Sequence, residues 1–239
     1  MSSSPSSTEA KQTVLETYNA LAPWYLTWIT SQSTHPKTDP RTTYTTLLLS
    51  SLPTTSPKAP QLPQILDLGS GPGIPTAAHL LRAGAHVLLN DLSPTQLSLA
   101  ASSLPPHLLA NTTFLPGDAA ALAVPPNSLS GAVSFFALFH LPRAEQAALL
   151  RKVHGWLRPG AVFVFNLGTV EGEEVWGEMM GRGMFWSGWG VEGNRGMVVG
   201  AGFEVLREEV LTSEVDEGVK FWWCAARKAV GQGDRKREG

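Results

Sequence analysis

The sequence predicts an α/β domain built on a doubly wound, mainly parallel sheet, and three observations support this fold class. Short apolar runs that end in turn residues, such as 65–68 and 86–91, are typical of buried strands. Stretches with apolar residues at helical spacing, such as 144–157, lie between such runs. A glycine-rich turn follows the first run, as a strand–turn–helix unit requires. The 239 residues are enough for one domain of this kind with short appendages.

Composition and charge narrow the possible functions. The formal net charge of -2 gives no overall field that attracts nucleic acid. Cys224 is the single cysteine, so an intramolecular disulfide or a cysteine-based metal cluster is excluded, and we expect no metal site. No apolar run is long enough to span a bilayer, and residues 1–12 lack the apolar core of a signal peptide. We therefore expect a cytoplasmic protein that binds neither nucleic acid nor a membrane.

The two ends of the chain are expected to be disordered, and the part between them to be folded. The Ser-rich residues 1–12 and the polar residues 229–239 predict disordered tails. Between them, 13–228 predict one domain. Its first part, 13–52, is expected to be a helical cap, with one helix over 14–22, a second beginning at Pro23 and a third over 44–52. A Pro/Thr/Ser-rich linker, 53–63, then leads into the first strand.

The rest of the chain is organised around the segment Ile-Leu-Asp-Leu-Gly-Ser-Gly-Pro-Gly at 65–73. Gly69, Gly71 and Gly73 allow a turn with positive φ, so a ligand can lie against bare backbone. Their spacing, G-x-G-x-G, differs from the G-x-G-x-x-G of dinucleotide sites. Asp67 would repel a pyrophosphate, but it suits a ligand that carries an ammonium or sulfonium charge. The loop therefore favours S-adenosylmethionine over NAD.

With these residues the segment resembles motif I of the class I S-adenosylmethionine-dependent methyltransferases, of the small-molecule type. The resemblance extends over roughly Leu15 to Arg227. It implies a Rossmann-like sheet of seven strands in the order 3-2-1-4-5-7-6, with the seventh strand antiparallel. Residues 64–168 would then form the donor-binding core, and 203–228 the closing strands. It also implies S-adenosylmethionine as the methyl donor and S-adenosylhomocysteine as the product.

Acids after the next two strands complete the expected donor site. Asp91 ends the second strand, 86–91, where a carboxylate can accept both ribose hydroxyls. Asp118 follows the third strand, and the resemblance places such an acid against the adenine amino group; capping of the following turn is the alternative. A fourth strand over 131–138 is expected to border the donor. The donor-binding candidates are Asp67, Gly69, Ser70, Gly71, Gly73, Asp91, Leu92, Asp118, Ala119, Phe136 and Ala137.

Three residues are the candidates for catalysis. His140 follows the fourth strand at the sheet edge where α/β proteins bind ligands, and a neutral imidazole there can take a proton from an acceptor. The alternative is that it ties a loop to a helix. Tyr18 and Tyr25 resemble, with Ala22, the tyrosine pattern of caps that fold over the donor. Packing of the cap helices on the sheet is the alternative for both.

Residues 172–200 are expected to form an acceptor-binding lid. Methionines and tryptophans alternate there with glycines; thioethers and wide rings adapt to irregular apolar ligands, and glycines allow movement. The alternative is a helix that packs these side chains against the sheet. The acceptor-binding candidates are Trp24, His140, Trp176, Met180, Phe185, Trp186 and Trp189.

The function expected from these features is in-line transfer of a methyl group to an O, N or S atom of a hydrophobic or aromatic small molecule. One alternative is a catalytically silent partner subunit or scaffold that binds S-adenosylmethionine. Another is an NAD-linked oxidoreductase, which the glycine spacing and Asp67 disfavour. The sequence leaves open the acceptor, the atom methylated, and whether the protein is a monomer or a homodimer.

Overall fold

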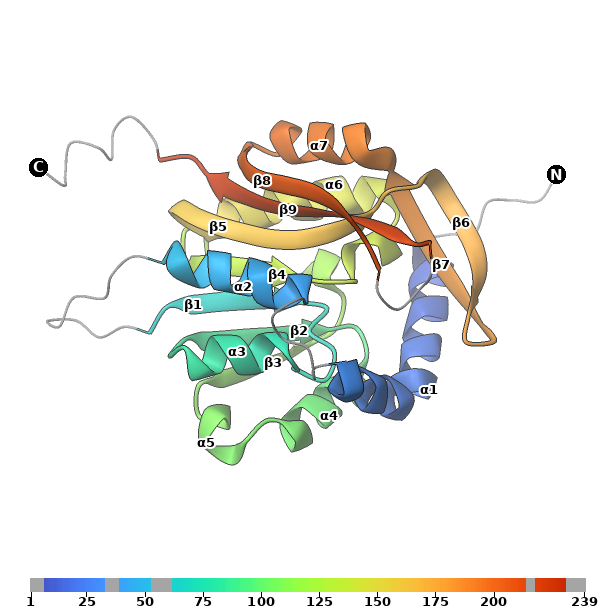
Figure 1. Cartoon of the computed structure of the whole chain (residues 1–239), viewed down its shortest axis with the longest axis horizontal. Coiled ribbons are helices and arrows are strands. Elements are labelled where there is room, and N and C mark those ends of the chain that lie inside the picture. Colours follow the sequence, from blue (N-terminus) through green and yellow to red (C-terminus); the bar gives the residue numbers. More distant parts are fainter. Residues whose placement is uncertain (1–6, 33–38, 53–61, 214–217, 231–239) are drawn as a thin grey trace, which may run out of the picture.

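The computed structural model describes residues 7–32, 39–52, 62–213 and 218–230. Its centre is a seven-stranded sheet with helices on both faces (Figure 1). The strands are β1 (Gln64–Leu68), β2 (His86–Asp91), β3 (Thr112–Pro116), β4 (Leu129–Ser134), β5 (Leu157–Gly168), β8 (Phe203–Thr212) and β9 (Lys220–Lys228). The helices are α1 (Ser7–Gln32), α2 (Pro40–Ser50), α3 (Thr76–Arg82), α4 (Pro94–Ser103), α5 (Pro106–Leu109), α6 (Arg143–Trp156) and α7 (Gly190–Gly200).

The strand order is β3-β2-β1-β4-β5-β9-β8. Strands β1 to β5 pair in parallel, whereas β9 runs antiparallel to both of its neighbours. This confirms the predicted order 3-2-1-4-5-7-6, because the numbers differ only through two additional strands, β6 and β7, that form a separate sheet. The carboxyl ends of β1, β2, β3 and β4 consequently meet at one edge of the sheet.

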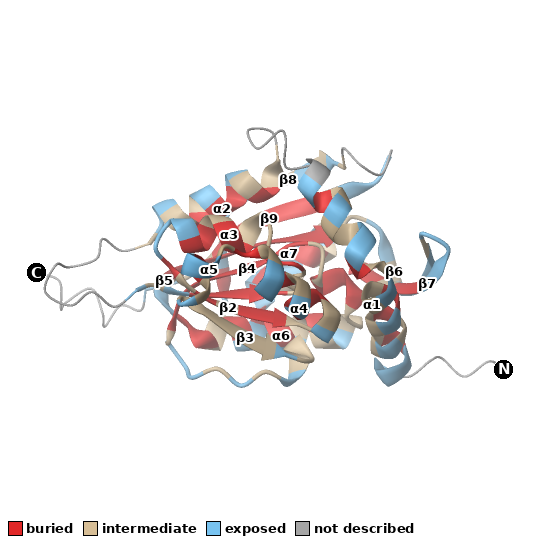
Figure 2. Ribbon diagram, turned by 90° about the horizontal axis from the view of Figure 1, so that it is seen from below, coloured by how far each residue is buried: buried red, intermediate tan, exposed pale blue. Residues whose placement is uncertain are grey.

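The alternation of side chains along the strands produces two apolar cores. Ile65 packs into a cluster with residues of α2, α3 and α4, while its neighbour Leu66 packs on the opposite face with residues of α6 and α7. Successive strand residues point to opposite faces, so an uninterrupted apolar run serves both cores. Figure 2 shows the result: the central strands are mostly buried, and exposed residues lie on the outer surfaces of the helices and on the hairpin of β6 (Glu171–Met179) and β7 (Arg182–Trp189).

The N-terminal helix corrects two predictions. The expected helices over 14–22 and from Pro23 are one helix, α1, which includes Pro23. It also begins at Ser7, so 7–12 do not belong to a disordered tail; 1–6 and 231–239 lie outside the described residues. The early start has a physical reason: Ala10 is buried against Met184 and Phe185, and such tertiary packing stabilises a turn that the local sequence does not favour.

The segment 172–200, expected to form a lid, is mainly a β-hairpin, so the alternative of a helix that packs its methionines and tryptophans against the sheet is wrong. β6 (Glu171–Met179) pairs with β7 (Arg182–Trp189), and α7 follows directly. Met180 and Gly181 join the two strands with φ of 54° and 73°, and positive φ at both positions matches the twist of a hairpin. Met-Gly is a weak turn signal, and a register shift between Gly172 and Val175 interrupts the alternation that would have revealed β6.

Several element boundaries also differ from the predictions. The fourth strand, expected over 131–138, ends at Ser134 because Phe136 adopts a φ of 58°, which turns the backbone out of the sheet. A short 3₁₀ turn, η2 (Leu138–His140), follows it, and another, η1 (Ala119–Ala121), follows β3. α2 starts before the expected 44–52, and α5 was not expected. Most of the predicted linker, 53–61, lies outside the described residues.

Candidate active site

The loop after β1 has a geometry that glycine alone provides. Gly69, Gly71 and Gly73 have φ of 68°, 54° and 73°, in the left-handed region that other residues avoid. A Cβ on Gly69 would lie 2.2 Å from the Cβ of Ala137, so the backbone there passes directly against the loop after β4. The amides of Gly69 and Ser70 donate to the Asn90 carbonyl at 2.8 and 2.9 Å, which fixes this loop to the end of β2.

A cavity of about 100 Å³ lies at the carboxyl edge of the sheet, between this loop, η2 and α1. It brings together most of the donor-binding candidates and all three catalytic candidates. The predicted residues on its wall are Tyr18, Tyr25, Gly69, Gly71, Asp91, Leu92, Asp118, Ala119, Phe136, Ala137 and His140. The remaining donor candidates, Asp67, Ser70 and Gly73, lie outside this wall.

Asp91 is held by the backbone that surrounds it. Its Oδ2 accepts from the Gly71 amide and its Oδ1 from the Ser93 amide, both at 2.8 Å. Burial raises the pKa of Asp91 to about 6, although these two hydrogen bonds act in the opposite direction. Each carboxylate oxygen has a second lone pair, so Asp91 keeps acceptor capacity toward the cavity.

Asp67 is a buried acid without a complete set of partners. Its side chain is 3% exposed, and its Oδ2 has no hydrogen bond. Burial and, secondarily, the charge of Asp91 raise the pKa of Asp67 to about 8. A buried carboxylate in this position is expensive unless a cation or a donor faces it. On the cavity wall, Asp91 and the bare backbone of Gly69 and Gly71 fit a nucleoside such as S-adenosylmethionine. Asp67, whose charge interacts with that of Asp91, lies behind this wall and favours a cationic ligand.

Asp118 caps a turn, a role that does not exclude contact with the adenine. Its Oδ1 accepts from the Ala120 amide at 2.8 Å, at the start of η1. Its Oδ2 lies 2.6 Å from Nζ of Lys11, which also pairs with Glu145 at 2.5 Å. This ion-paired group ties the first turns of α1 to the core. No sequence pattern indicated this ion-paired group, because Lys11 lies within the stretch expected to be disordered.

Tyr18 and His140 form a hydrogen-bonded pair on the cavity wall. The Tyr18 hydroxyl lies 2.9 Å from Nε2 of His140, and Nδ1 of the same ring lies 2.9 Å from the Phe185 carbonyl. A carbonyl only accepts, so Nδ1 carries the proton and Nε2 accepts from Tyr18. Burial lowers the pKa of His140 to about 4, against the opposing effect of the Phe185 carbonyl, and burial raises the pKa of Tyr18. Both groups are therefore neutral near pH 7.

The expected acceptor-binding aromatics lie elsewhere. Trp24 is exposed and stacks on Trp28 at 5.8 Å, and Trp176 and Met180 are exposed on the hairpin. Trp189 packs beneath the guanidinium of Arg143, 4.8 Å from its ring centre. None of these four candidates lines the cavity.

Two further acceptor candidates approach the site indirectly. Phe185 contributes its carbonyl to His140, and the Trp186 ring centre lies 6.2 Å from that of His140. The apolar wall includes three residues that sequence reasoning did not select, Val14 and Leu15 of α1 and Leu141 after η2, together with Leu138, which was expected to border the donor. The helical spacing of apolar residues along 14–22 was the signal that could have pointed to α1 as part of the wall.

Comparison with known proteins agrees with this architecture. Residues 65–160 match a family model described as a methyltransferase domain. This segment contains the glycine loop, Asp91, Asp118 and His140 of the cavity wall. Over residues 65–160 the chain is thus similar to methyltransferase domains. A comparison with curated proteins gives no match.

Three solved structures illustrate the shared fold. A 1,6-didemethyltoxoflavin-N1-methyltransferase from Burkholderia thailandensis, with bound 1,6-didemethyltoxoflavin and S-adenosylhomocysteine, is 15% identical; the match covers 96% of this chain and 93% of that one, with a TM-score of 0.68. The [4+2]-cyclase SpnF is 18% identical, with 95% and 98% coverage and a TM-score of 0.68. An S-adenosylmethionine-dependent methyltransferase from Mesorhizobium loti is 23% identical, with 71% and 94% coverage and a TM-score of 0.56.

Two negative findings apply to the described part of the chain. No group of three or more His, Cys, Asp or Glu side chains there is arranged to hold a metal ion. Likewise, none of the helices in the described ranges combines the length and the apolar character needed to cross a membrane.

Proposed function

We propose that this chain transfers the methyl group of S-adenosylmethionine to an O, N or S atom of a hydrophobic or aromatic small molecule. The observation that carries the proposal is the composition of one cavity wall. The wall combines bare glycine backbone and carboxylates with the neutral Tyr18–His140 pair and apolar residues. The glycines and carboxylates suit a cationic nucleoside, and the neutral pair with the apolar residues suits an uncharged reaction partner.

On the donor side, the chain supplies shape and charge. Gly69 and Gly71 leave room for a ligand against the backbone, and Asp91 has lone pairs for ribose hydroxyls. Asp67 would be stabilised in its ionised form by the ammonium or sulfonium charge. When bound, the donor supplies an electrophilic methyl group and retains the S–C bonding pair as a neutral thioether.

On the acceptor side, Tyr18 and His140 can move one proton. An acceptor X–H group can hydrogen-bond to the Tyr18 oxygen while that hydroxyl donates to Nε2 of His140. As the X–CH₃ bond forms, the proton of X–H passes to Tyr18 and the Tyr18 proton to His140. The resulting imidazolium would be held through Nδ1 by the Phe185 carbonyl. This path is useful for a weakly acidic acceptor, and a phenol or thiol would need it less.

Alignment and exclusion of water account for most of the expected rate. Val14 and Leu15 of α1 face the cavity together with Leu138 and Leu141, so two reactants bound there would be enclosed by apolar side chains. Holding both reactants in line converts a bimolecular step into an effectively unimolecular one, and a dry site strengthens the electrostatic contacts.

The test combines binding with product analysis. The purified chain is titrated with S-adenosylmethionine, S-adenosylhomocysteine and NAD. It is then incubated with S-adenosylmethionine and a panel of phenols, thiols, amines and heteroaromatic compounds, and methylated products are identified by mass spectrometry. One protein of the same fold is a cyclase, so products must be measured as well as binding. Binding of both adenosyl compounds with a methylated product supports the proposal.

Other results would overturn it. Binding of NAD alone would favour the oxidoreductase. Binding of the adenosyl compounds without turnover of any acceptor would favour the scaffold.

A further inference from the structure

Gln96 is a buried side chain on the cavity wall whose polar atoms are unused. The residue is 1% exposed, and neither Oε1 nor Nε2 of its side chain has a hydrogen-bond partner. Its backbone is satisfied, because its amide donates to the Ser93 hydroxyl at 3.1 Å in the cap of α4. A buried amide with both ends unpaired is costly, and such a group on a cavity wall calls for a ligand that completes it.

The surroundings of Gln96 identify the part of the cavity that it serves. A Cβ built on Gly71 would lie 4.0 Å from Oε1 of Gln96 and 3.7 Å from Cε1 of Tyr25. The amide of the same glycine donates to Oδ2 of Asp91. Gln96, Tyr25 and Asp91 therefore surround one patch of bare backbone. The missing side chain of Gly71 leaves that patch open to a ligand.

The chemistry of this patch is that of a hydroxyl-binding site. A carboxylate only accepts hydrogen bonds, so a hydroxyl bound to Asp91 points its proton at the acid and keeps its oxygen lone pairs free. A neighbouring N–H donor completes such a hydroxyl, and Nε2 of Gln96 is an unpaired donor on the same cavity wall as Asp91. Oε1 of the same amide can accept from a second hydroxyl. A vicinal diol matches both groups.

We infer that Gln96 binds the methyl donor, S-adenosylmethionine. Its side-chain amide hydrogen-bonds the same ribose diol whose hydroxyls donate to Asp91. This inference rests on the proposed function, because it takes S-adenosylmethionine as the ligand of the cavity. It assigns to Gln96 a contribution to the affinity for S-adenosylmethionine, and it leaves proton transfer to Tyr18 and His140. Gln96 opens the helix that follows Asp91, so a single short segment of chain would supply both partners of the diol.

The test uses a second buried glutamine as its matched control. Gln146 is fully buried, but its Nε2 donates to the Ser187 hydroxyl at 2.7 Å and to the Leu141 carbonyl at 2.9 Å, and the residue does not line the cavity. Gln96→Met and Gln146→Met therefore make the same chemical change in two buried settings. The dissociation constant of S-adenosylhomocysteine and the melting temperature of the empty chain are measured for both variants.

The two variants are expected to behave in opposite ways. Gln96→Met should weaken S-adenosylhomocysteine binding about tenfold, as expected for one buried hydrogen bond, and leave the melting temperature of the empty chain unchanged or higher. Gln146→Met should lower that melting temperature and leave the affinity unchanged. Gln96→Glu keeps the shape but has no N–H donor, so it should also weaken binding.

A ligand-side experiment separates the diol from other contacts. S-adenosylhomocysteine analogues that lack the 2′- or the 3′-hydroxyl should bind the wild-type chain less tightly. At least one of these losses should shrink in Gln96→Met, because the partner of that hydroxyl is already gone. Equal affinity of wild type and Gln96→Met, or identical losses in both, would overturn the inference. If the wild-type chain bound no S-adenosylhomocysteine, the proposed function itself would fail.

Discussion

The two sides of the cavity are built in different ways. On the donor side, Gly69 directly follows β1 and Asp91 is the last residue of β2. These are neighbouring parallel strands, so local sequence and strand pairing bring the two residues together. On the acceptor side, Tyr18 and His140 are 122 residues apart and meet only because α1 packs across the carboxyl edge of the sheet. The donor side is thus a property of a continuous motif, and the acceptor side is a property of tertiary packing.

The two sides also differ in charge. Asp67, Asp91 and Asp118 gather on the donor side, where burial holds the pKa of Asp67 and that of Asp91 above their ordinary values. The acceptor side is neutral and apolar. Burial of Asp67 and Asp91 therefore costs free energy that a cationic ligand would offset, whereas the groups of the acceptor side are stabilised by contacts within the protein.

The largest expected effect comes from closing the donor side. Gly69→Ala combines a positive φ with a Cβ that would lie 2.2 Å from Ala137. We expect it to cost about 2–5 kcal/mol of stability and to abolish S-adenosylhomocysteine binding. Gly84→Ala is the control: it has a φ of 87° but open space around its Cβ, so it should cost only about 1–2 kcal/mol and leave binding intact. Chemical denaturation and calorimetry measure both; normal binding by Gly69→Ala would contradict the loop assignment.

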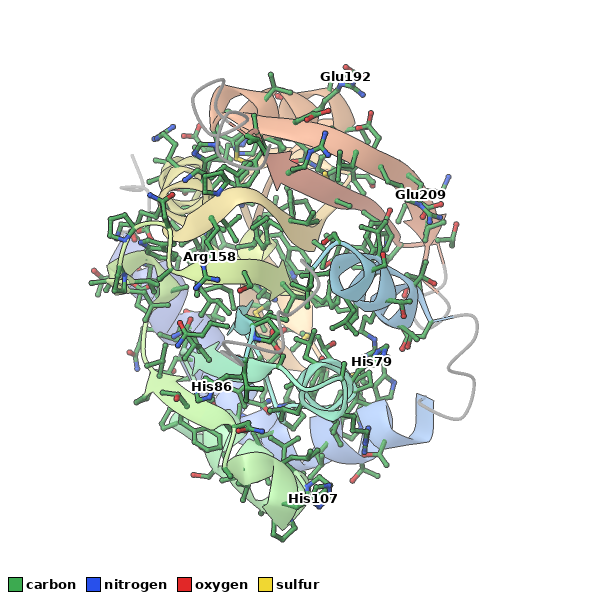
Figure 3. All side chains as sticks on the ribbon, turned by 90° about the vertical axis from the view of Figure 1, so that its left-hand side faces the viewer. His79, His86, His107, Arg158, Glu192 and Glu209 are labelled. Atoms are coloured by element: carbon green, nitrogen blue, oxygen red, sulfur yellow. The ribbon has the colours of Figure 1, made fainter. Side chains whose placement is uncertain are left out.

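On the acceptor side, removal of the imidazole should affect turnover alone. His140→Gln is expected to lower kcat about a hundredfold with a weakly acidic acceptor, while S-adenosylhomocysteine affinity stays within about twofold. Tyr18→Phe should act similarly because it interrupts the same proton path. His86→Gln is the matched control, since Nε2 of His86 also meets a hydroxyl, that of Thr113, but at the amino end of β2 (Figure 3). Full turnover in His140→Gln would make that histidine structural.

The charge difference predicts a pH dependence of stability for the empty chain. The pKa of Asp67, raised to about 8 by burial, means that the folded state binds more protons than the unfolded state up to that pH, so stability falls as pH rises. Asp91 acts in the same direction up to about 6, and His140, with its pKa lowered from 6.5 to about 4, acts oppositely below 6.5.

The interval from pH 6.5 to 8 therefore isolates Asp67. The melting temperature of the empty chain should drop by a few degrees across it. In Asp67→Asn the melting temperature should stay nearly constant across this pH interval, as measured by scanning calorimetry. A slope that persists in the variant would assign it to another group.

The smallest effect is expected on the hairpin. Trp176→Ser removes an exposed ring that does not line the cavity, so stability should change by about 0.5 kcal/mol or less, and the acceptor KM should stay constant. Leu15→Ala, which enlarges the cavity wall, should instead raise the acceptor KM. A rise for Trp176→Ser alone would return the hairpin to the acceptor site.

The predictions from sequence succeeded where function and local structure share one stretch of chain. The ranges 86–91 and 112–116 are strands as expected, and the glycine turn has the positive φ values that its composition requires. The predictions were wrong where contacts between segments far apart in the sequence decide the secondary structure. Ser7 to Gln12 are helical because Ala10 is buried beneath the hairpin, and 171–189 form strands because β7 packs on α1.

The sequence by itself determined the parallel sheet and the chemistry of the donor side, and its resemblance to a known family determined the strand order. The physical reason is that strand–turn–helix units place their turn residues at one edge of the sheet, whatever the rest of the chain does. Only the tertiary structure decided which groups face the cavity from α1 and η2, and that Gln96 is left there without a partner. Burial and hydrogen bonding between segments more than a hundred residues apart fix a tautomer, a pKa and an unpaired amide. None of these is encoded in a local pattern.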